Sequence, residues 1–161
     1  MVFGCRKIEN ETPHEAGRRL LESLYREHFR ADLPPILVSS RGKPYFEDDP
    51  VYFSISHTKR HAFAALSDRP VGIDAEELDR IVNPKLAEKI LSPRELAQYH
   101  AAVDKNRALL NFWVLKEAAA KCSGQGLRGY PNHTDFSLDD PRVFEHHGCL
   151  VAIMEEDAYV V

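Results

Sequence analysis

The chain has 161 residues, of which 43% are hydrophobic and 29% are charged, and its formal net charge is -4. This length suffices for one domain with a substantial core, or for two small halves that share one. The negative charge argues against a general nucleic-acid binder, and no apolar run approaches the roughly 20 residues that cross a bilayer. We therefore expect no nucleic acid and no membrane among the partners.

The cysteines and the start of the sequence favour a reducing compartment. Cys5, Cys122 and Cys149 show no C-x-x-C spacing, and three cysteines cannot all pair within one chain. The first residues, MVFGCRKIENE, lack the apolar core of a secretory signal. We expect reduced thiols in a cytoplasmic protein, with Cys122 as a small buried residue.

The first half of the sequence predicts one helix followed by strands. Thr12 and Glu15 form a capping-box pattern around Pro13, and apolar residues then recur at helical spacing, which predicts a helix over about 13–30. Alternating residues predict three strands in an antiparallel meander, over 51–56, 62–66 and 70–75.

The second half of the sequence predicts two helices and a hairpin. Ser92, Pro93 and Glu95 repeat the helix-start signal, and a further helix over about 106–122 is expected to end at Gly124. Residues 149–154 and 158–161 predict a closing hairpin. No linker, repeat or low-complexity segment interrupts this alternation of helices and strands.

Two acidic motifs are the most informative feature of the chain. In VGIDAEE, alternate residues of an extended segment project to the same side, so that Asp74 and Glu76 can face one hard cation. In FWVLKEAAAK, a helix sets Glu117 and Lys121 one turn apart. Together the motifs predict a magnesium site beside a phosphate-binding lysine. Taken alone, each motif favours a solvated strand end or a helix ion pair of about 0.2–0.5 kcal/mol, and Trp113 is expected to pack in the core.

The histidines do not predict a zinc site. His57 and His61 have H-x-x-x-H spacing, but that spacing places both side chains on one face only in a helix, and the surrounding alternation predicts a strand or a tight turn. His146 and His147 are adjacent without a matching third ligand.

Several sequence blocks, in one order, cover most of the chain. They are GRRLL at Gly17, RGKPYF at Arg41, SISHT at Ser54, VGIDAEE at Val71, SPRELAQY at Ser92, FWVLKEAAAKCSGQGL at Phe112 and DFSL at Asp135. With these blocks the chain resembles the 4'-phosphopantetheinyl transferases, which move the phosphopantetheine arm of coenzyme A onto a serine of a carrier protein. The GKP and SISH blocks look like the surfactin-synthetase-activating branch of the family.

The resemblance implies an α+β fold in which two similar α/β halves, about 1–69 and 70–161, form an intramolecular pseudodimer. It also implies a monomer in preference to a dimer. Longer relatives carry an additional stretch between the first strand and the first helix, whereas here only a short segment separates Phe3 from Pro13. We therefore expect a shortened N-terminal half and a more open nucleotide pocket.

The resemblance also assigns roles to residues. It implies that Mg²⁺, or Mn²⁺ in its place, is held by three carboxylates, that two groups act directly on the transfer, and that further residues contact coenzyme A. The implied metal ligands are Asp74, Glu76 and Glu117. Among the catalytic residues, Glu117 is the base, Lys121 stabilises the transferred phosphoryl group, and His57 lies against the phosphates. The implied coenzyme contacts are Arg18, Lys43, Pro44, Ser56, His57 and Lys121.

The implied activity is Mg²⁺-dependent transfer of 4'-phosphopantetheine from coenzyme A to an apo acyl or peptidyl carrier protein, with release of adenosine 3',5'-bisphosphate. Two alternatives stay open: a non-catalytic module of the same fold that binds the carrier or coenzyme A, and a Mg²⁺-dependent phosphoesterase.

Between Lys105 and Arg128, five basic residues accompany a single acid. This basic stretch fits contact with an acidic carrier protein, or simply a solvated helix face.

Overall fold

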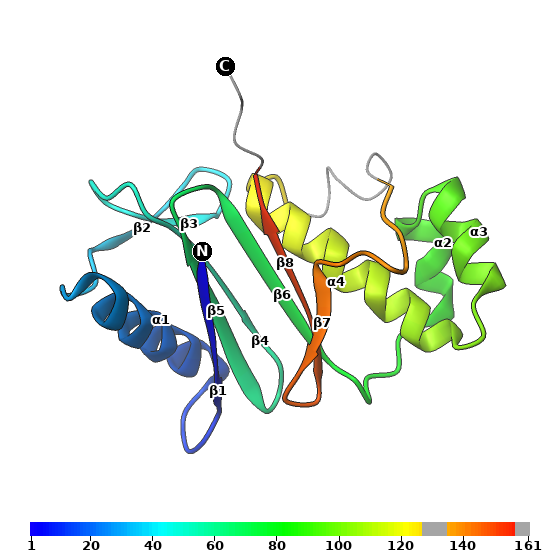
Figure 1. Ribbon diagram of the computed structural model, residues 1–161, viewed down its shortest axis with the longest axis horizontal. Coiled ribbons are helices and arrows are strands. Elements are labelled where there is room, and N and C mark those ends of the chain that lie inside the picture. Colours follow the sequence, from blue (N-terminus) through cyan, green and yellow to red (C-terminus); the bar gives the residue numbers. More distant parts are fainter. Residues whose placement is uncertain (127–134, 157–161) are drawn as a thin grey trace.

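The computed structural model describes residues 1–126 and 135–156. The elements follow one another along the chain as shown in Figure 1. In order they are β1 (Val2–Lys7), α1 (Pro13–Phe29), β2 (Ile36–Val38), β3 (Pro44–Phe46), β4 (Tyr52–His57), β5 (His61–Ser67), β6 (Val71–Glu77), the 3₁₀ turn η1 (Pro84–Leu86), α2 (Ala87–Ile90), α3 (Pro93–Ala101), α4 (Lys105–Ser123), β7 (Val143–His146) and β8 (Cys149–Glu155).

The first sheet and its helix form the N-terminal part of the fold. Thr12 caps α1 through a hydrogen bond from Glu15 N, and the Glu15 side chain accepts in return from Thr12 N, which confirms the predicted capping box. The helix ends at Arg30, which adopts a left-handed conformation. Its apolar stripe packs on an antiparallel sheet of order β1-β5-β4. The segment between β1 and α1 is short, as predicted.

The second sheet has the order β6-β8-β7 and is covered by α4. Asp104 caps the start of α4 by accepting from Arg107 N, and Gly124 ends the helix in a left-handed conformation, as predicted. The capping box of α3, formed by Ser92 and Glu95, is also present. The fold thus combines helices with antiparallel sheets, in agreement with the predicted α+β class.

The predicted three-stranded meander is wrong in its third strand. Strands β4 and β5 do pair antiparallel, but β6 pairs with β8, in a ladder that begins with Val71 opposite Glu155. Both edges of β5 are already occupied, by β1 and β4, so β6 finds its partner in the distant β8. The hairpin of β8 is formed with β7, which the sequence did not indicate, and residues 158–161 lie outside the described ranges.

Side-chain hydroxyls join the two sheets where β4 runs beside β6. Ile73 N donates to Ser54 Oγ over 3.1 Å, and Ala75 N donates to Ser56 Oγ over 3.2 Å. Because the partner numbers advance together by two, β4 and β6 run parallel at this seam. The seam has serine side chains where a continuous sheet would have backbone carbonyls.

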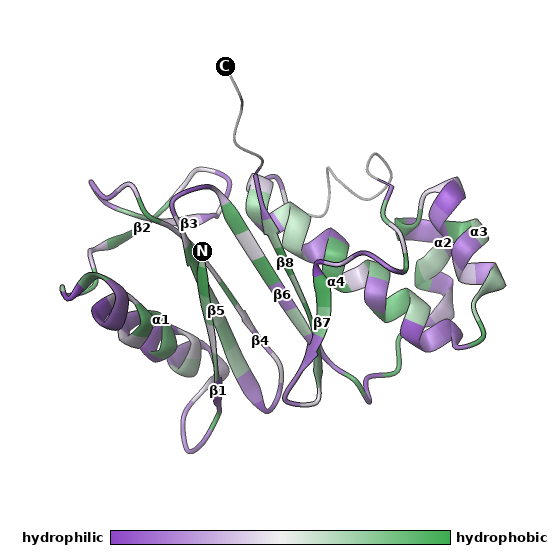
Figure 2. Ribbon diagram, in the orientation of Figure 1, coloured by the Kyte–Doolittle hydropathy of each residue, from purple (hydrophilic) through white to green (hydrophobic). Residues whose placement is uncertain are grey.

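The hydrophobic residues form layers on both sides of each sheet. Helix α1 packs on the outer face of the first sheet, α4 packs on the outer face of the second, and a third cluster, which includes Phe63, Ile73 and Val151, fills the space between the sheets. Figure 2 shows the matching pattern, with β5 and β8 largely hydrophobic, β6 mixed, and α1 hydrophilic on its outer side. A pseudo-twofold relation between halves 1–69 and 70–161 stays a prediction. None of the described helices has the length and apolar character needed to cross a bilayer.

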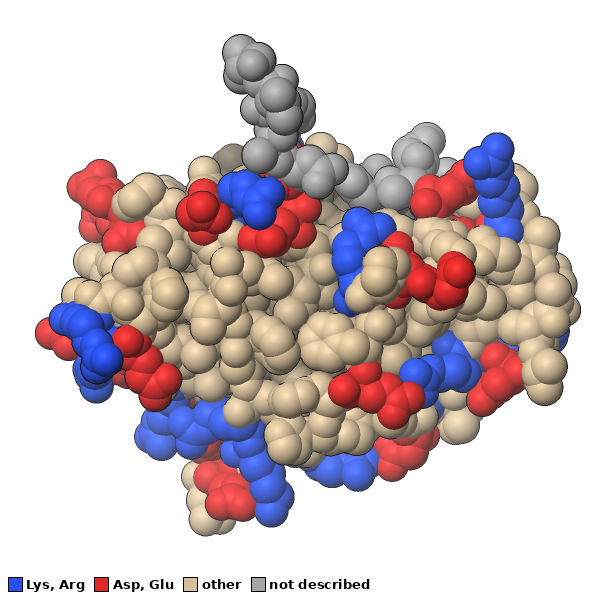
Figure 3. All heavy atoms as spheres, viewed as in Figure 1, with Lys and Arg blue, Asp and Glu red and all other residues tan. Residues whose placement is uncertain are grey.

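The basic stretch of the sequence does not form a basic face. Lys116 is 1% exposed, and its Nζ lies 2.8 Å from Oε2 of the buried Glu95. The other basic residues of the stretch within the described ranges also have partners: Lys105 donates to the carbonyls of His100 and Ala102, Arg107 pairs with Glu145, and Lys121 pairs with Asp74. Basic and acidic side chains are interspersed around the rim of the face seen in Figure 3. The described basic residues of the stretch are thus paired, whereas Arg128 lies outside the described ranges.

Candidate active site

Asp74 is the buried centre of the candidate site. It lies on β6 and is 6% exposed, and its Oδ1 accepts hydrogen bonds from Ser56 Oγ at 3.0 Å and from Lys121 Nζ at 2.7 Å. Its second oxygen, Oδ2, is buried and has no hydrogen-bond partner within the described part of the chain. A buried carboxylate oxygen without a donor is costly, so Oδ2 suits a cation.

A glycine allows Lys121 to reach this carboxylate. A Cβ atom at Gly72 would lie 2.0 Å from Ala118 O and 2.4 Å from Cys122 N, so only glycine lets α4 approach β6 this closely. At this separation Lys121 Nζ also donates to Ile73 O over 3.1 Å. The lysine thus spans from helix to strand, and one of its three donor hydrogens remains for a ligand.

Glu117 lies one turn before Lys121 and is half-buried. Burial, followed by the negative charge of Asp74, raises the pKa of Glu117 to about 7, although Lys121 opposes the shift. Glu76 raises the pKa of Glu117 further. The raised pKa brings the Glu117 carboxyl closer to neutral pH than an ordinary glutamate, which suits a group that accepts a proton.

Glu76 is held by two groups that sequence reasoning did not connect with it. Trp113 Nε1 donates to Glu76 Oε1 over 3.1 Å, and the guanidinium of Arg80 donates to the same oxygen. Arg80 also lies 5.6 Å from the centre of the Trp113 ring. Trp113 packs against the hydrophobic core, as predicted, and its indole N–H also orients the Glu76 carboxylate. The position of Trp113 one turn before Glu117 was the sequence signal that could have placed it near the acidic residues.

The acidic residues fit a hard cation that keeps ligands from solvent or substrate. Asp74, Glu76 and Glu117 are close enough for their charges to shift the pKa of Glu117, but they do not bring one oxygen each within 4.8 Å of one another. Magnesium usually takes one or two protein carboxylates and completes its octahedron with water and phosphate oxygens. Asp74 Oδ2, which has no donor, and the Glu117 carboxylate are the two candidate ligands of this kind, and Glu76 affects the pKa of Glu117 less than Asp74 does.

Lys43 brings the other sheet to the same pocket. Lys43, Pro44, Glu117 and Lys121 all line one pocket, together with residues of β4 and the end of α4. Lys43 Nζ donates to Cys122 O over 2.5 Å, and burial lowers the pKa of Lys43. Of the predicted residues, the structure thus gathers Lys43, Pro44, Glu117 and Lys121 around one pocket, with Asp74 bound to Lys121 beneath it.

Three predicted coenzyme contacts lie elsewhere or have other partners. Ser56 is buried, and its hydroxyl is engaged by Asp74 and by Ala75 N, so it positions Asp74. His57 is exposed at the end of β4, where it lines a separate hollow with Glu76 and Arg80. Arg18 is exposed on α1 and is absent from the described lining of the Lys43 pocket.

The cysteines do not supply a nucleophile near this pocket. Burial raises the pKa of Cys122, although Lys43 opposes the shift, and the thiol donates to Pro70 O. Cys122 is buried, as predicted. Burial, followed by the charge of Cys149, raises the pKa of Cys5 to about 11. Both groups are thiols at neutral pH, whereas the thiolate is the reactive form.

Comparison with known proteins shows which family the segment around this site resembles. Residues 70–148 match the family model of the 4'-phosphopantetheinyl transferase superfamily. The chain is 31% identical to the 4'-phosphopantetheinyl transferase gsp of Aneurinibacillus migulanus over 88 residues, which are 53% of this chain and 36% of that protein. It is 29% identical to the 4'-phosphopantetheinyl transferase HetI of Nostoc sp. over 129 residues, 74% of this chain and 54% of the relative.

A relative with a different printed name matches a shorter segment. The holo-[acyl-carrier-protein] synthase of Cronobacter sakazakii is 41% identical over 64 residues, 36% of this chain and 51% of that protein. The chain therefore spans about half or less of the length of these relatives. The segment matched by the family model contains Asp74, Glu76, Glu117 and Lys121. This segment of the chain is similar to the 4'-phosphopantetheinyl transferase superfamily.

Proposed function

We propose that this protein is a 4'-phosphopantetheinyl transferase. The substrate would be coenzyme A, and the acceptor would be a serine of an apo acyl or peptidyl carrier protein. The observation that carries the proposal is the meeting of Glu117, Lys121 and Lys43 around one pocket, with the buried Asp74 bound to Lys121, in a segment similar to proteins named as such transferases.

Glu117 is proposed as the base. The carrier serine would donate its hydroxyl proton to the Glu117 carboxylate while its oxygen attacks the phosphorus next to the pantetheine arm. The bond from that phosphorus to the bridging oxygen breaks, and adenosine 3',5'-bisphosphate leaves with the bonding electrons. A pKa of about 7 suits Glu117 to accept a proton at neutral pH without binding it permanently.

The two lysines are proposed to bind phosphate groups from opposite sides of the pocket. Lys121 is fixed by Ile73 O and Asp74, so its remaining donor is held in place without reorganisation when negative charge develops on the phosphoryl group. Lys43 is half-buried and carries a flexible point charge, which suits a terminal phosphate such as the 3'-phosphate of coenzyme A.

Magnesium, or manganese in its place, is proposed as the cofactor of the same site. Asp74, Glu117 and Glu76 would hold it, and the bound ion would neutralise the pyrophosphate of coenzyme A. The residues around it have separate tasks. Ser56 and Lys121 fix the Asp74 carboxylate, and Trp113 fixes Glu76, so that neither turns away when substrate enters.

The decisive experiment measures the intact mass of an apo acyl carrier protein after incubation with this protein, coenzyme A and magnesium. The expected result is a mass gain equal to phosphopantetheine that disappears with a chelator and with the Asp74→Ala variant. A matched control is Asp68→Ala, an exposed carboxylate outside the pocket lining, which should transfer at the wild-type rate. If folded wild-type protein modifies none of several acyl and peptidyl carriers, the transferase proposal is wrong. Coenzyme or carrier binding would then identify the non-catalytic module, and phosphate release without a carrier would identify the phosphoesterase.

A further inference from the structure

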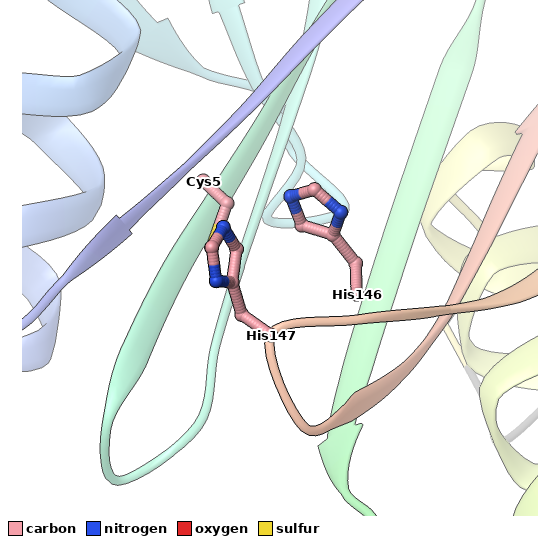
Figure 4. A group of neighbouring side chains, drawn as sticks. All are labelled: Cys5, His146 and His147. Carbon is pink, nitrogen blue, oxygen red and sulfur yellow. The ribbon is translucent and has the colours of Figure 1, made fainter.

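A second group of side chains lies outside the lining of the Lys43 pocket, where β1 of the first sheet approaches the end of β7 in the second sheet. Cys5 comes from β1 of the first sheet, His146 is the last residue of β7 in the second sheet, and His147 lies in the turn between β7 and β8. One ligand atom from each of the three side chains lies within 4.8 Å of the other two. Figure 4 shows the three side chains converging from these two distant parts of the chain.

The donor atoms of this group are free for a ligand. Within the described ranges, neither Cys5 Sγ nor the ring nitrogens of His146 and His147 make a hydrogen bond or an ion pair, and the two rings make only aromatic contacts. Cys5 and His146 are half-buried, whereas His147 is exposed and open to solvent. One sulfur and two imidazoles that converge without partners are the ligand types that zinc prefers.

We propose that Cys5, His146 and His147 form a site for a zinc-type transition-metal ion that links the first sheet to the β7–β8 turn. The site is separate from the acidic pocket and uses a different ligand class. The sequence showed His146 and His147 without a third ligand; the fold supplies that ligand from a strand at the other end of the chain.

The geometry requires only a small adjustment of side chains. Zinc binds cysteine sulfur at about 2.3 Å and histidine nitrogen at about 2.0–2.1 Å in a tetrahedral arrangement, so the donors of a formed site lie roughly 3.3–3.7 Å apart. From separations of up to 4.8 Å, the three groups must move by about 1 Å, which rotation about side-chain bonds provides. The fourth position would be taken by water or by a further side chain.

Two neighbouring side chains, those of Cys149 and His61, could supply the fourth ligand. The thiol of Cys149, at the start of β8, lies 3.9 Å from His61 Nδ1, and the ring of His61 stacks on that of His147 at 5.8 Å. His61 and Cys149 also form a second potential group with Glu77. Glu77 is already paired with the guanidinium and the backbone N–H of Arg60, so that group is less suited to bind an ion.

Cobalt substitution tests the proposal without any assay of transfer. Reduced, metal-free full-length protein is titrated with Co²⁺, and thiolate-to-cobalt charge-transfer absorption is recorded; a Co²⁺ ion on carboxylates alone gives no such band. Wild-type protein should show the band at one equivalent, and Zn²⁺ should displace it. Cys5→Ser should abolish the band. Cys122→Ser is the matched control, because Cys122 is a buried thiol on α4 outside the group, and it should keep the band.

A second variant keeps the test valid if Cys5→Ser folds poorly. His147 has a φ of 48°, a conformation that asparagine tolerates, so His147→Asn removes a ligand without straining the turn. This variant should bind Co²⁺ at least about tenfold more weakly, and it should lose the rise in Tm that zinc gives the wild type. The proposal is wrong if the wild type shows no thiolate band, if the band survives Cys5→Ser, or if His147→Asn binds as tightly as the wild type.

Discussion

Replacing Glu117 by glutamine should stabilise the metal-free protein above neutral pH. The pKa of this carboxyl is raised from 4.5 to about 7, chiefly by burial and then by Asp74, so the fold favours its neutral form. The stability that neutral Glu117 contributes is fully present below about pH 4.5 and is lost as pH rises through about 7. Glutamine is neutral at every pH and therefore avoids this loss.

The magnitude follows from the size of the shift. A shift from 4.5 to about 7 corresponds to about 3.4 kcal/mol for a fully buried group. Glu117 is only half-buried, and solvent screening reduces the figure to about 1–2 kcal/mol. For a chain of this length, a difference of that size at pH 8 raises Tm by about 2–8 °C, while the two proteins should melt alike near pH 5.

Thermal unfolding followed by circular dichroism, in a chelator at pH 5 and at pH 8, measures this effect. Glu27→Gln, an exposed carboxylate on α1, is the matched control and should melt like the wild type at both values. Added magnesium should then raise the Tm of the wild type at pH 8 more than that of Glu117→Gln. The electrostatic account of Glu117 is refuted if its glutamine variant is no more stable than the wild type at pH 8, or if the gain is equal at pH 5.

Three further substitutions test other parts of the structure. Gly72→Ala places a methyl group 2.0 Å from Ala118 O, so urea unfolding should show a loss above about 2 kcal/mol; an unchanged midpoint would mean that α4 does not need this close approach. Lys116→Met leaves the carboxylate of Glu95 buried without its cation, and the free energy of unfolding should fall by about 3–5 kcal/mol. Lys105→Met, at the exposed start of α4, is its control, and equal unfolding curves for the two variants would contradict the buried ion pair. Trp113→Phe removes the hydrogen bond to Glu76, and we expect transfer to need a higher magnesium concentration, with little change in Tm. If the magnesium titration of this variant overlays that of the wild type, Trp113 does not contribute to the metal site.

Local signals in the sequence predicted the three longer helices and the approach of the two acidic motifs to each other. The capping boxes at Thr12 and Ser92 and the stop at Gly124 depend on contacts within a few residues, and such contacts can be read from sequence. Lys121 does meet Asp74, because the strand and helix periodicities set the directions of these side chains.

The errors concern contacts between distant parts of the chain. The pairing of β6 with β8 joins segments at opposite ends of the second half, and alternation alone does not specify the partner of a strand. The same holds for Ser56, whose hydroxyl turned out to hold Asp74, and for the approach of Cys5 to His146 and His147. In each case the side chain is visible in the sequence, but the fold determines its neighbour.

The serine seam between β4 and β6 links the two sheets through side chains and not through a backbone ladder. Along this line only the hydroxyls of Ser54 and Ser56 receive the amides of Ile73 and Ala75, whereas both outer ladders are complete. Tilting one sheet against the other would break these two hydrogen bonds and would also disturb the hydrophobic cluster between the sheets. Because Ser56 also donates to Asp74, any such tilt moves the buried carboxylate as well. Ser56 thus belongs both to the contact between the sheets and to the acidic site, so that a change in the packing of the two sheets is felt at Asp74.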